Sequence, residues 1–283
     1  TRVKRIAPDV VQTWMYLANI YGGVIGRLVG VPVIWGIFAG STGKKYYSWP
    51  TYLLIKFSAV ISSIVPKLIV SCSAYARVTH NQIGYAKNRM AFIPTGFSVK
   101  EGANYIDVES RQDAHSANVP ARLGMLARIS SEKDHILLVK AVATVIDRGY
   151  NVSLVLAGGV GLSKHNSYLL PIVAQHKLQD HVTFLGSVAD IEEFFEQVDL
   201  FLLISKSEGF PTVLGEAMAR GLPCIASNVG DSQILLGDSK QLVRPRDVDQ
   251  LIVAIQQFLD MSDKQKRAVG ARNKMRIKNL FPK

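Results

Sequence analysis

Apolar residues fall in short continuous runs along most of the chain, and stretches with the periodicity of an amphipathic helix separate these runs. Short apolar runs bounded by polar or turn-forming residues are typical of strands buried in a parallel sheet. Strands that alternate with helices predict βαβ units. In the first hundred residues the pattern predicts four strands, at residues 9–14, 31–38, 67–73 and 89–96.

A second alternating series begins after a polar segment. Residues 98–120 are mixed in charge and without clear periodicity, and we interpret them as an interdomain linker. The fold class is therefore α/β, with two Rossmann-like, doubly wound parallel-sheet domains at residues 1–112 and 113–283 that bind ligands at the carboxyl ends of their strands. The strands predicted in the second series are residues 121–128, 151–159, 181–187, 199–205 and 222–227. Its predicted helices are residues 133–149, 167–178, 190–198, 212–221 and 248–261.

Length and composition agree with two packed domains. The chain has 283 residues, of which 48% are hydrophobic, enough for two cores. Its two cysteines, Cys72 and Cys224, have apolar neighbours, which favours reduced, buried thiols in a reducing compartment. Charged residues such as Arg27 interrupt the longest apolar stretches, so we expect no transmembrane helix and no signal peptide. The chain opens at Thr1 in what reads as the middle of a domain, so we expect the first domain to be incomplete.

The net charge of +11 lies in the first third of the chain. Residues 1–100 contain twelve Lys and Arg and only one acidic residue, Asp9, whereas the remainder contains equal numbers of each sign. Such asymmetry attracts an anionic partner, either a phosphate-bearing substrate or a membrane surface. The basic residues are dispersed among apolar segments and accompany no nucleic-acid-binding motif, so we expect no nucleic acid partner. The alternative is a solubilising surface.

Two cations follow the first strand of the second series. Arg128 and Lys133 lie between that strand and the next predicted helix. An arginine fork and a mobile lysine charge could clamp a diphosphate, although both residues could equally serve surface solubility. After the next strand, Gly158, Gly159 and Gly161 fit either close approach to a ligand or a plain strand-helix turn.

Glu208 and Glu216 flank a Gly-Phe-Pro turn before a helix that begins near Thr212. The free amides of that helix's first turn form an anion site. Two carboxylates would repel a diphosphate unless they hold hydroxyl groups, and a nucleotide sugar supplies both groups. The spacing of eight residues between the two glutamates carries little information alone, since Glu101 and Glu109 have the same spacing. This second pair lies in the linker and is assigned no role.

The motifs together resemble the retaining glycosyltransferases of family GT4, which have the GT-B fold. The resemblance rests on "IGYAKNRMAFIPTG", "GMLARISSEKDH", "FLGSVADIEEFF" and "SEGFPTVLGEAMARGLPCIASNVGD". It covers the second domain almost end to end and the first domain in part. It implies transfer of a sugar from a nucleotide diphosphate sugar with retained anomeric configuration, no cofactor and no metal, and we expect a UDP-sugar over a GDP-sugar.

The resemblance also implies residue roles. Arg128 and Lys133 would stabilise the leaving diphosphate, and Glu208, the third catalytic residue, would hold donor-sugar hydroxyls. Glu216 would bind the ribose. The backbone from Gly209 to Leu214 would receive phosphate, so that the donor-binding set is Gly209, Phe210, Pro211, Thr212, Val213, Leu214 and Glu216.

The sequence departs from the family at several positions. Phe38 stands where the family places a polar residue, often histidine, and Thr95 stands where asparagine is usual. The chain also ends at Lys283, before the helix that usually crosses back to the first domain. These departures put turnover in doubt. We interpret His80 and His135 as packing or structural residues rather than bases.

The leading hypothesis is a hexosyltransferase that acts on a glycan or lipid-linked acceptor in cell-surface polysaccharide or lipopolysaccharide biosynthesis. The apolar face of "TYLLIKFSAVISSIV" and the basic first third favour a cytoplasmic protein, peripheral at the inner face of an anionic membrane, although a buried core helix would have the same pattern. The alternative function is a nucleotide-sugar-binding remnant with little or no transferase activity. A nucleotide-sugar epimerase is a third reading, against which the Arg, Lys and two-Glu set argues.

Overall fold

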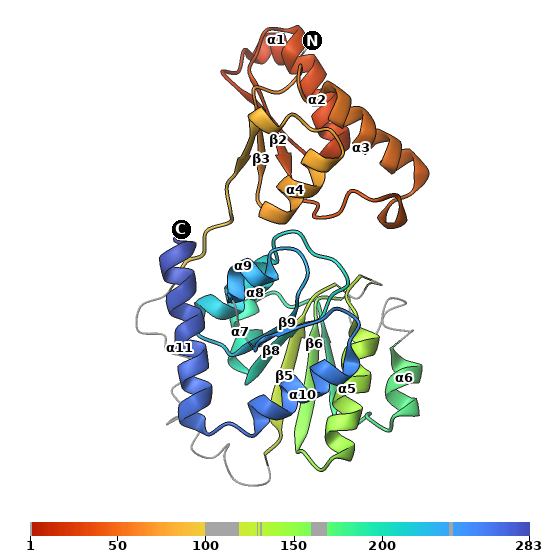
Figure 1. Cartoon of the computed structure of the whole chain (residues 1–283), viewed down its shortest axis with the longest axis vertical. Coiled ribbons are helices and arrows are strands. Elements are labelled where there is room, and N and C mark those ends of the chain that lie inside the picture. The colour runs from red at the N-terminus through yellow and green to blue at the C-terminus, as the bar shows by residue number, and fades with distance from the viewer. Residues whose placement is uncertain (1, 100–118, 129, 131, 160–168, 238–239) are drawn as a thin grey trace. The chain divides into compact units, whose positions relative to one another are not determined.

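The computed structural model describes residues 2–99, 119–128, 130, 132–159, 169–237 and 240–283 (Figure 1). It divides into two compact units: Thr1–Thr95 with Ser207–Phe210, and Gly96–Lys206 with Pro211–Lys283. The predicted domain boundary between residues 112 and 113, most of the predicted linker, and the Glu101/Glu109 pair lie outside the described residues.

The first unit contains a four-stranded parallel sheet in the order β1-β2-β3-β4. Each of the four strands falls within a run of apolar residues that predicts it, and strands in sequence order are neighbours in the sheet. The strands are β1 (Val11–Trp14), β2 (Val33–Ile37), β3 (Leu68–Ser71) and β4 (Met90–Phe92). The helices are α1 (Arg2–Ile6), α2 (Met15–Leu28), α3 (Trp49–Ile61) and α4 (Ala74–Gln82). The side chains of Trp35, Ile37 and Ile69 are fully buried in its core.

The second unit contains a six-stranded parallel sheet in the order β10-β9-β8-β5-β6-β7. The chain runs outward from β5 to β7 on one side and then returns to build β8, β9 and β10 on the other side. The strands are β5 (Ala121–Leu126), β6 (Val152–Ala157), β7 (Val182–Gly186), β8 (Leu200–Leu203), β9 (Cys224–Ser227) and β10 (Leu242–Val243). All five predicted strands of this series are confirmed, and the direction of growth reverses between β5 and β8.

The helices of this unit are α5 (His135–Asp147), α6 (Leu170–Gln175), α7 (Ile191–Glu196), α8 (Thr212–Ala219), α9 (Ser232–Leu236), α10 (Val248–Leu259) and α11 (Asp263–Leu280). Helix α5 lies beside α10, and α8 lies beside α11 (Figure 1). The main core joins α5 and α10 to the sheet through Leu138, Val142 and Ile255, among others. The expected α/β fold with two parallel sheets is confirmed.

Helix α11 was not predicted from the sequence. Its 18 residues are rich in Lys and Arg, so they carry no broad apolar stripe of the kind that reveals a helix. Its start is nevertheless defined by a capping box between Ser262 and Gln265, which satisfies backbone donors at the first turn. Its buried side is held by Asn273, whose Nδ2 donates to the carbonyl of Leu222 at 2.9 Å, and by Ile277.

Cys72 and Cys224 are both buried thiols, as expected. Among the helices that the structure describes, none combines the length and the apolar character needed to span a membrane.

Candidate functional site

The carboxyl ends of β5 and β8 define the topological switch point of the second sheet. These two strands are adjacent, and the chain leaves them toward opposite sides. In open α/β sheets the loops diverge at such a point and leave a crevice in which ligands bind. Fold topology alone therefore directs attention to the loops after Leu126 and Leu203.

Backbone hydrogen bonds tie these two loops together. The Lys206 amide donates to the Glu132 carbonyl at 2.8 Å, and the Asp134 amide donates to the Ile204 carbonyl at 2.9 Å. Lys133 forms an isolated antiparallel bridge with Ser205. The residue that the sequence predicts as a diphosphate ligand is thus anchored to the neighbouring strand rather than carried on a free loop.

His135 and Lys206 complete the support of Lys133. The His135 ring is fully buried, and its Nδ1 lies 2.8 Å from the Lys133 carbonyl. A carbonyl can only accept, so Nδ1 carries the proton; burial lowers the pKa of His135 and favours this neutral form. Lys206 Nζ lies 3.5 Å from Asp134 Oδ1, and Asp134 is almost buried. The structure agrees with a structural role for His135.

Arg128 follows β5 at the same edge of the sheet and is exposed. The neighbouring strand approaches closely: the Ala127 amide donates to the Ala157 carbonyl at 2.9 Å. Gly158 has a φ of +106°, and a Cβ there would lie 2.5 Å from the Ala127 carbonyl oxygen. Gly158 is therefore required by backbone conformation and by close packing beside Arg128. Gly159 is half-buried, and Gly161 lies outside the described residues.

Helix α8 begins at Thr212, as predicted, directly after Pro211. The amides of Leu214 and Gly215 donate to the Pro211 carbonyl at 3.1 and 3.4 Å. The amides of Thr212 and Val213 precede these bonds and have no intrahelical carbonyl ahead of them. Both point out of the positive end of the helix, which suits a phosphate.

Glu216 is half-buried one turn into α8. Burial raises the pKa of its carboxyl above the ordinary value, nearby Arg220 opposes the shift, and Glu192 adds to it. Arg220 also fixes the local backbone: its Nη1 donates to the Glu216 carbonyl at 2.7 Å, and its Nε donates to Glu192 at 2.9 Å. A carboxylate that burial disfavours is stabilised by hydrogen bonds, such as those from a ligand's hydroxyl groups.

Three predicted site residues group with the first unit: Glu208, Gly209 and Phe210. Glu208 is half-buried and Phe210 is buried. A Cβ at Gly209 would lie 2.6 Å from the Phe38 carbonyl oxygen, so this position requires glycine. The predicted residues thus divide between the two units, with Arg128, Lys133, Glu216 and the segment Pro211–Leu214 in the second.

Phe38 and His80 lie in the first unit. Phe38 directly follows β2 at the carboxyl edge, is 46% exposed, and packs on Trp14 with ring centroids 4.7 Å apart. His80 is fully buried. Its Nδ1 lies 2.7 Å from the Ala76 carbonyl and its Nε2 lies 3.0 Å from the Tyr16 hydroxyl. Both ring nitrogens are therefore engaged, which agrees with a packing role.

Comparison with known proteins identifies the family. A model of the family described as "Glycosyl transferases group 1" matches residues 108–275. The chain belongs to this family. The match contains Arg128, Lys133, Glu208 and Glu216, and it confirms the glycosyltransferase resemblance.

Relatives of this chain include a protein of lipopolysaccharide core biosynthesis. The putative glycosyltransferase EpsF of Bacillus subtilis is 31% identical over 71% of this chain and 53% of its own length. The lipopolysaccharide core biosynthesis mannosyltransferase LpsB of Rhizobium meliloti is 24% identical over 84% of this chain and 65% of its own length. The chain therefore spans about half to two thirds of these relatives.

Solved structures show that the chain has the GT-B fold. HepE of Anabaena, in complex with UDP and glucose, gives a TM-score of 0.83 at 19% identity and covers 99% of this chain and 77% of its own. Sucrose-phosphate synthase from Thermosynechococcus elongatus gives a TM-score of 0.84 at 21% identity. The match covers 99% of this chain and 71% of the synthase chain. These values confirm the expected fold.

Sequence reasoning missed the residues that support the site. Lys206 lies three residues after the end of β8, and Arg128 lies two residues after the end of β5, so the signal that drew attention to Arg128 could also have found Lys206. Phe97 carried no such signal: it fills the space beside Gly215, where a Cβ would lie 2.1 Å from the Phe97 ring. Their separation in sequence hides this contact.

Proposed function

We propose that this glycosyltransferase moves a sugar from a nucleotide diphosphate sugar, with retention of anomeric configuration, to a glycan or lipid-linked acceptor in cell-surface polysaccharide biosynthesis. One observation carries the proposal. The Lys133 loop is hydrogen-bonded to the end of β8 at the topological switch point, where Arg128 is exposed and α8 begins.

These groups suit the departure of a nucleoside diphosphate. Negative charge builds on the leaving diphosphate as its bond to the sugar breaks, and fixed cations and amides stabilise that charge. Arg128 and Lys133 supply the cations, and the Thr212 and Val213 amides supply oriented dipoles. Glu216 accepts hydrogen bonds from the ribose, and Glu208 accepts them from donor-sugar hydroxyls. The chemistry needs no metal and no cofactor, and residual activity in a strong chelator would test that expectation.

The relatives and the fold guide the choice of donor and acceptor. HepE is solved with UDP-glucose, which supports a UDP-sugar over a GDP-sugar. A UDP-Gal:alpha-D-GlcNAc-diphosphoundecaprenol alpha-1,3-galactosyltransferase of Escherichia coli is 22% identical over 96% of this chain and 72% of its own length. This supports a hexosyltransferase of the GT4 type and a lipid-linked acceptor.

An exposed apolar stripe supports a peripheral location at the inner face of the membrane. Four side chains on one face of α3 are more than half exposed, namely Trp49, Leu53, Phe57 and Val60. The first hundred residues add a large excess of positive charge. Apolar side chains beside cations are typical of a surface that contacts anionic lipid.

A second candidate function is a nucleotide-sugar-binding protein with little or no transferase activity. Phe38 favours it, because an apolar, partly exposed ring at the carboxyl edge of the first sheet supplies no acid, base or hydrogen bond. The two candidates share the donor site and differ only in turnover.

Calorimetric titration of UDP and GDP tests the donor site. We expect UDP to bind and Glu216→Ala to weaken it at least about tenfold, the scale of lost hydrogen bonds to a charged group. Glu196→Ala, which removes an exposed carboxylate on α7, is the matched control and should bind as the parent does. Equal affinities in all three proteins would contradict the assignment. Transfer of labelled sugar to a lipid-linked glycan, with the product anomer determined, then separates a transferase from a binding protein.

A further inference from the structure

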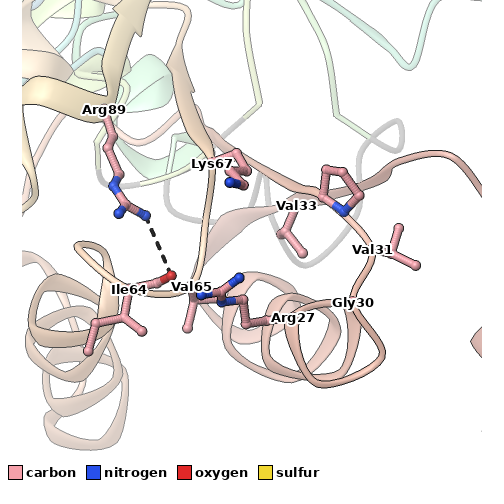
Figure 2. A pocket seen from close by; sticks show the side chains of 9 residues that line it. Arg27, Gly30, Val31, Val33, Ile64, Val65, Lys67 and Arg89 are labelled. Atoms are coloured by element: carbon pink, nitrogen blue, oxygen red, sulfur yellow. Dashed lines mark hydrogen bonds between the residues drawn. The ribbon is translucent and has the colours of Figure 1, made fainter.

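A basic pocket lies at the amino-terminal edge of the first sheet (Figure 2). Its volume is about 230 Å³, and three cations line it: Arg27, Lys67 and Arg89. Arg27 is in the last turn of α2, Lys67 directly precedes β3, and Arg89 directly precedes β4. None of the predicted site residues lines the pocket, and Phe38 lies at the opposite, carboxyl edge of this sheet.

The positive charge of the pocket is not balanced locally. None of its lining residues is acidic, and the first hundred residues contain a single carboxylate side chain, Asp9. Within the part of the chain that the structure describes, Arg27, Lys67 and Arg89 form no ion pair with a carboxylate. Three cations around one small hollow repel each other unless an anion joins them.

Helix capping does not account for these cations. At the end of α2 the Gly30 amide donates to the Arg27 carbonyl at 3.2 Å, and the Val31 amide donates to the Gly26 carbonyl at 2.9 Å. Gly30, with φ of +82°, permits this closure. The terminal carbonyls of α2 are therefore satisfied by backbone, without the Arg27 side chain.

Arg89 differs from the other two cations. Its Nη1 donates to the Pro66 carbonyl and lies 3.5 Å from the Ile64 carbonyl, the contact drawn in Figure 2. It holds the turn after α3 and still has other guanidinium donors. Arg27 and Lys67 are thus the residues whose charge the fold itself does not use.

The rim of the pocket is apolar. Ile64, which lines it, is 63% exposed, and Val31, Pro32 and Val65 also line the pocket. The volume is below the roughly 300–1,000 Å³ of pockets that take drug-sized ligands. A small anion with an apolar extension fits both the size and the rim.

We propose that this pocket binds a phosphate ester, with Arg27 and Lys67 as its cationic ligands and the apolar rim against the group that the phosphate carries. Such an ester is either the headgroup of an anionic glycerophospholipid or a soluble glycerol phosphate. The site does not rest on the proposed transferase function, because none of its lining residues is a proposed donor ligand and it needs no sugar.

Two binding measurements with the whole chain test the site. One is calorimetric titration of sn-glycerol 3-phosphate; the other is co-sedimentation with vesicles of phosphatidylcholine with and without phosphatidylglycerol. We expect Arg27→Gln and Lys67→Gln each to weaken binding about tenfold, as expected for loss of a charge-assisted hydrogen bond. Lys140→Gln, which changes an exposed cation on α5 of the second unit, is the matched control and should bind within about twofold of the parent, since a surface charge contributes little. UDP affinity and the melting temperature should be the same in all four proteins.

The two probes distinguish the sources of the ester. Loss of vesicle binding in the pocket variants but not in Lys140→Gln identifies a lipid headgroup, and loss confined to glycerol phosphate identifies a soluble ester. The proposal is overturned if the parent binds neither probe. It is also overturned if Lys140→Gln weakens binding as much as the pocket variants, because attraction would then be a general effect of surface charge. A failure to bind UDP would count against the proposed function alone.

Discussion

At the scale of single residues, the support of Lys133 is more informative than the lysine itself. Sequence position made Arg128, Lys133 and Glu216 candidate ligands because residues after strands and at helix starts can be recognised locally. It could not show that the Lys133 carbonyl accepts a bond from buried His135, or that Lys206 pairs with Asp134. Such contacts depend on how the β5 and β8 loops meet in three dimensions.

His135 should act as a positioning residue for Lys133. His135→Leu removes the donor to the Lys133 carbonyl, and we expect UDP affinity to fall about fivefold or more because the loop is less well held. His135→Asn keeps an N–H donor near the Nδ1 position and should bind UDP within about twofold of the parent. Calorimetric titration gives the affinities. Equal losses in the two variants would contradict positioning and indicate that only the volume of the ring matters.

His80 should make stability depend on pH. Burial lowers the pKa of His80 to about 4 from an ordinary 6.5. Between pH 4 and pH 6.5, His80 therefore binds a proton in the unfolded chain but not in the folded chain. The stabilisation is fully present above about pH 6.5 and is lost as the pH falls toward 4. A shift of this size corresponds to about 3 kcal/mol. The pH must be varied over this whole window to detect the effect.

Urea unfolding of variants isolates this contribution from the carboxylates that titrate nearby. The loss of unfolding free energy between pH 6.5 and pH 4 should be smaller in His80→Gln than in the parent. His176→Gln, which removes a histidine that is only partly buried, should keep the slope of the parent. Parallel curves for all three proteins would show that His80 does not titrate as its burial requires.

At the scale of elements, the strands were predictable and the polar or very short elements were not. Continuous apolar runs identified β5, β6 and β8 because both faces of a parallel sheet are covered. Helix α11 is too polar to show a stripe, and β10 has only two residues. The start of α8 was predicted because proline and glycine mark it locally. The packing of Phe97 against this helix was not predicted.

Gly215 should determine how closely α8 packs against Phe97. A Cβ at Gly215 would lie 2.1 Å from the Phe97 ring. The backbone of Phe97 is held in place, because its amide N–H donates a hydrogen bond to the Phe281 carbonyl at 2.9 Å. We therefore expect Gly215→Ala to lower the free energy of unfolding by about 1–3 kcal/mol, as overpacking does. Since α8 carries the proposed phosphate-binding amides, UDP affinity should fall as well.

A double-mutant cycle in urea tests this contact. Phe97→Ala leaves a cavity and should cost about 3–5 kcal/mol by itself. Because it also removes the clash, Gly215→Ala should cost less in the Phe97→Ala background than in the parent, which gives a coupling energy of about 1 kcal/mol or more. Additive costs would contradict the packing described between these two residues.

At the scale of the whole molecule, sequence patterning predicted two parallel-sheet units and the excess of charge in the first. It did not predict that Ser207–Phe210 groups with that first unit, because these residues lie between β8 and α8 of the other. The sequence also did not show whether the apolar face of α3 is buried or exposed, since both arrangements give the same hydrophobic periodicity. In the structure Leu53 and Phe57 are more than half exposed. These apolar side chains can therefore contribute to membrane binding independently of the positive charges.

Vesicle binding should therefore have two components that respond to different changes. Raising the salt from about 0.1 M to about 1 M shortens the screening length from about 10 Å to about 3 Å and should weaken the electrostatic part. The double variant Leu53→Gln and Phe57→Gln should lower the affinity about tenfold at both salt concentrations, since each side chain buries only part of its apolar surface. Val253→Gln, which changes an exposed residue of the second unit, is the control and should bind vesicles as the parent does. Co-sedimentation measures all three proteins. If the double variant binds as the parent does, α3 is not the contacting face, and the proposed peripheral location would have to rest on charge alone.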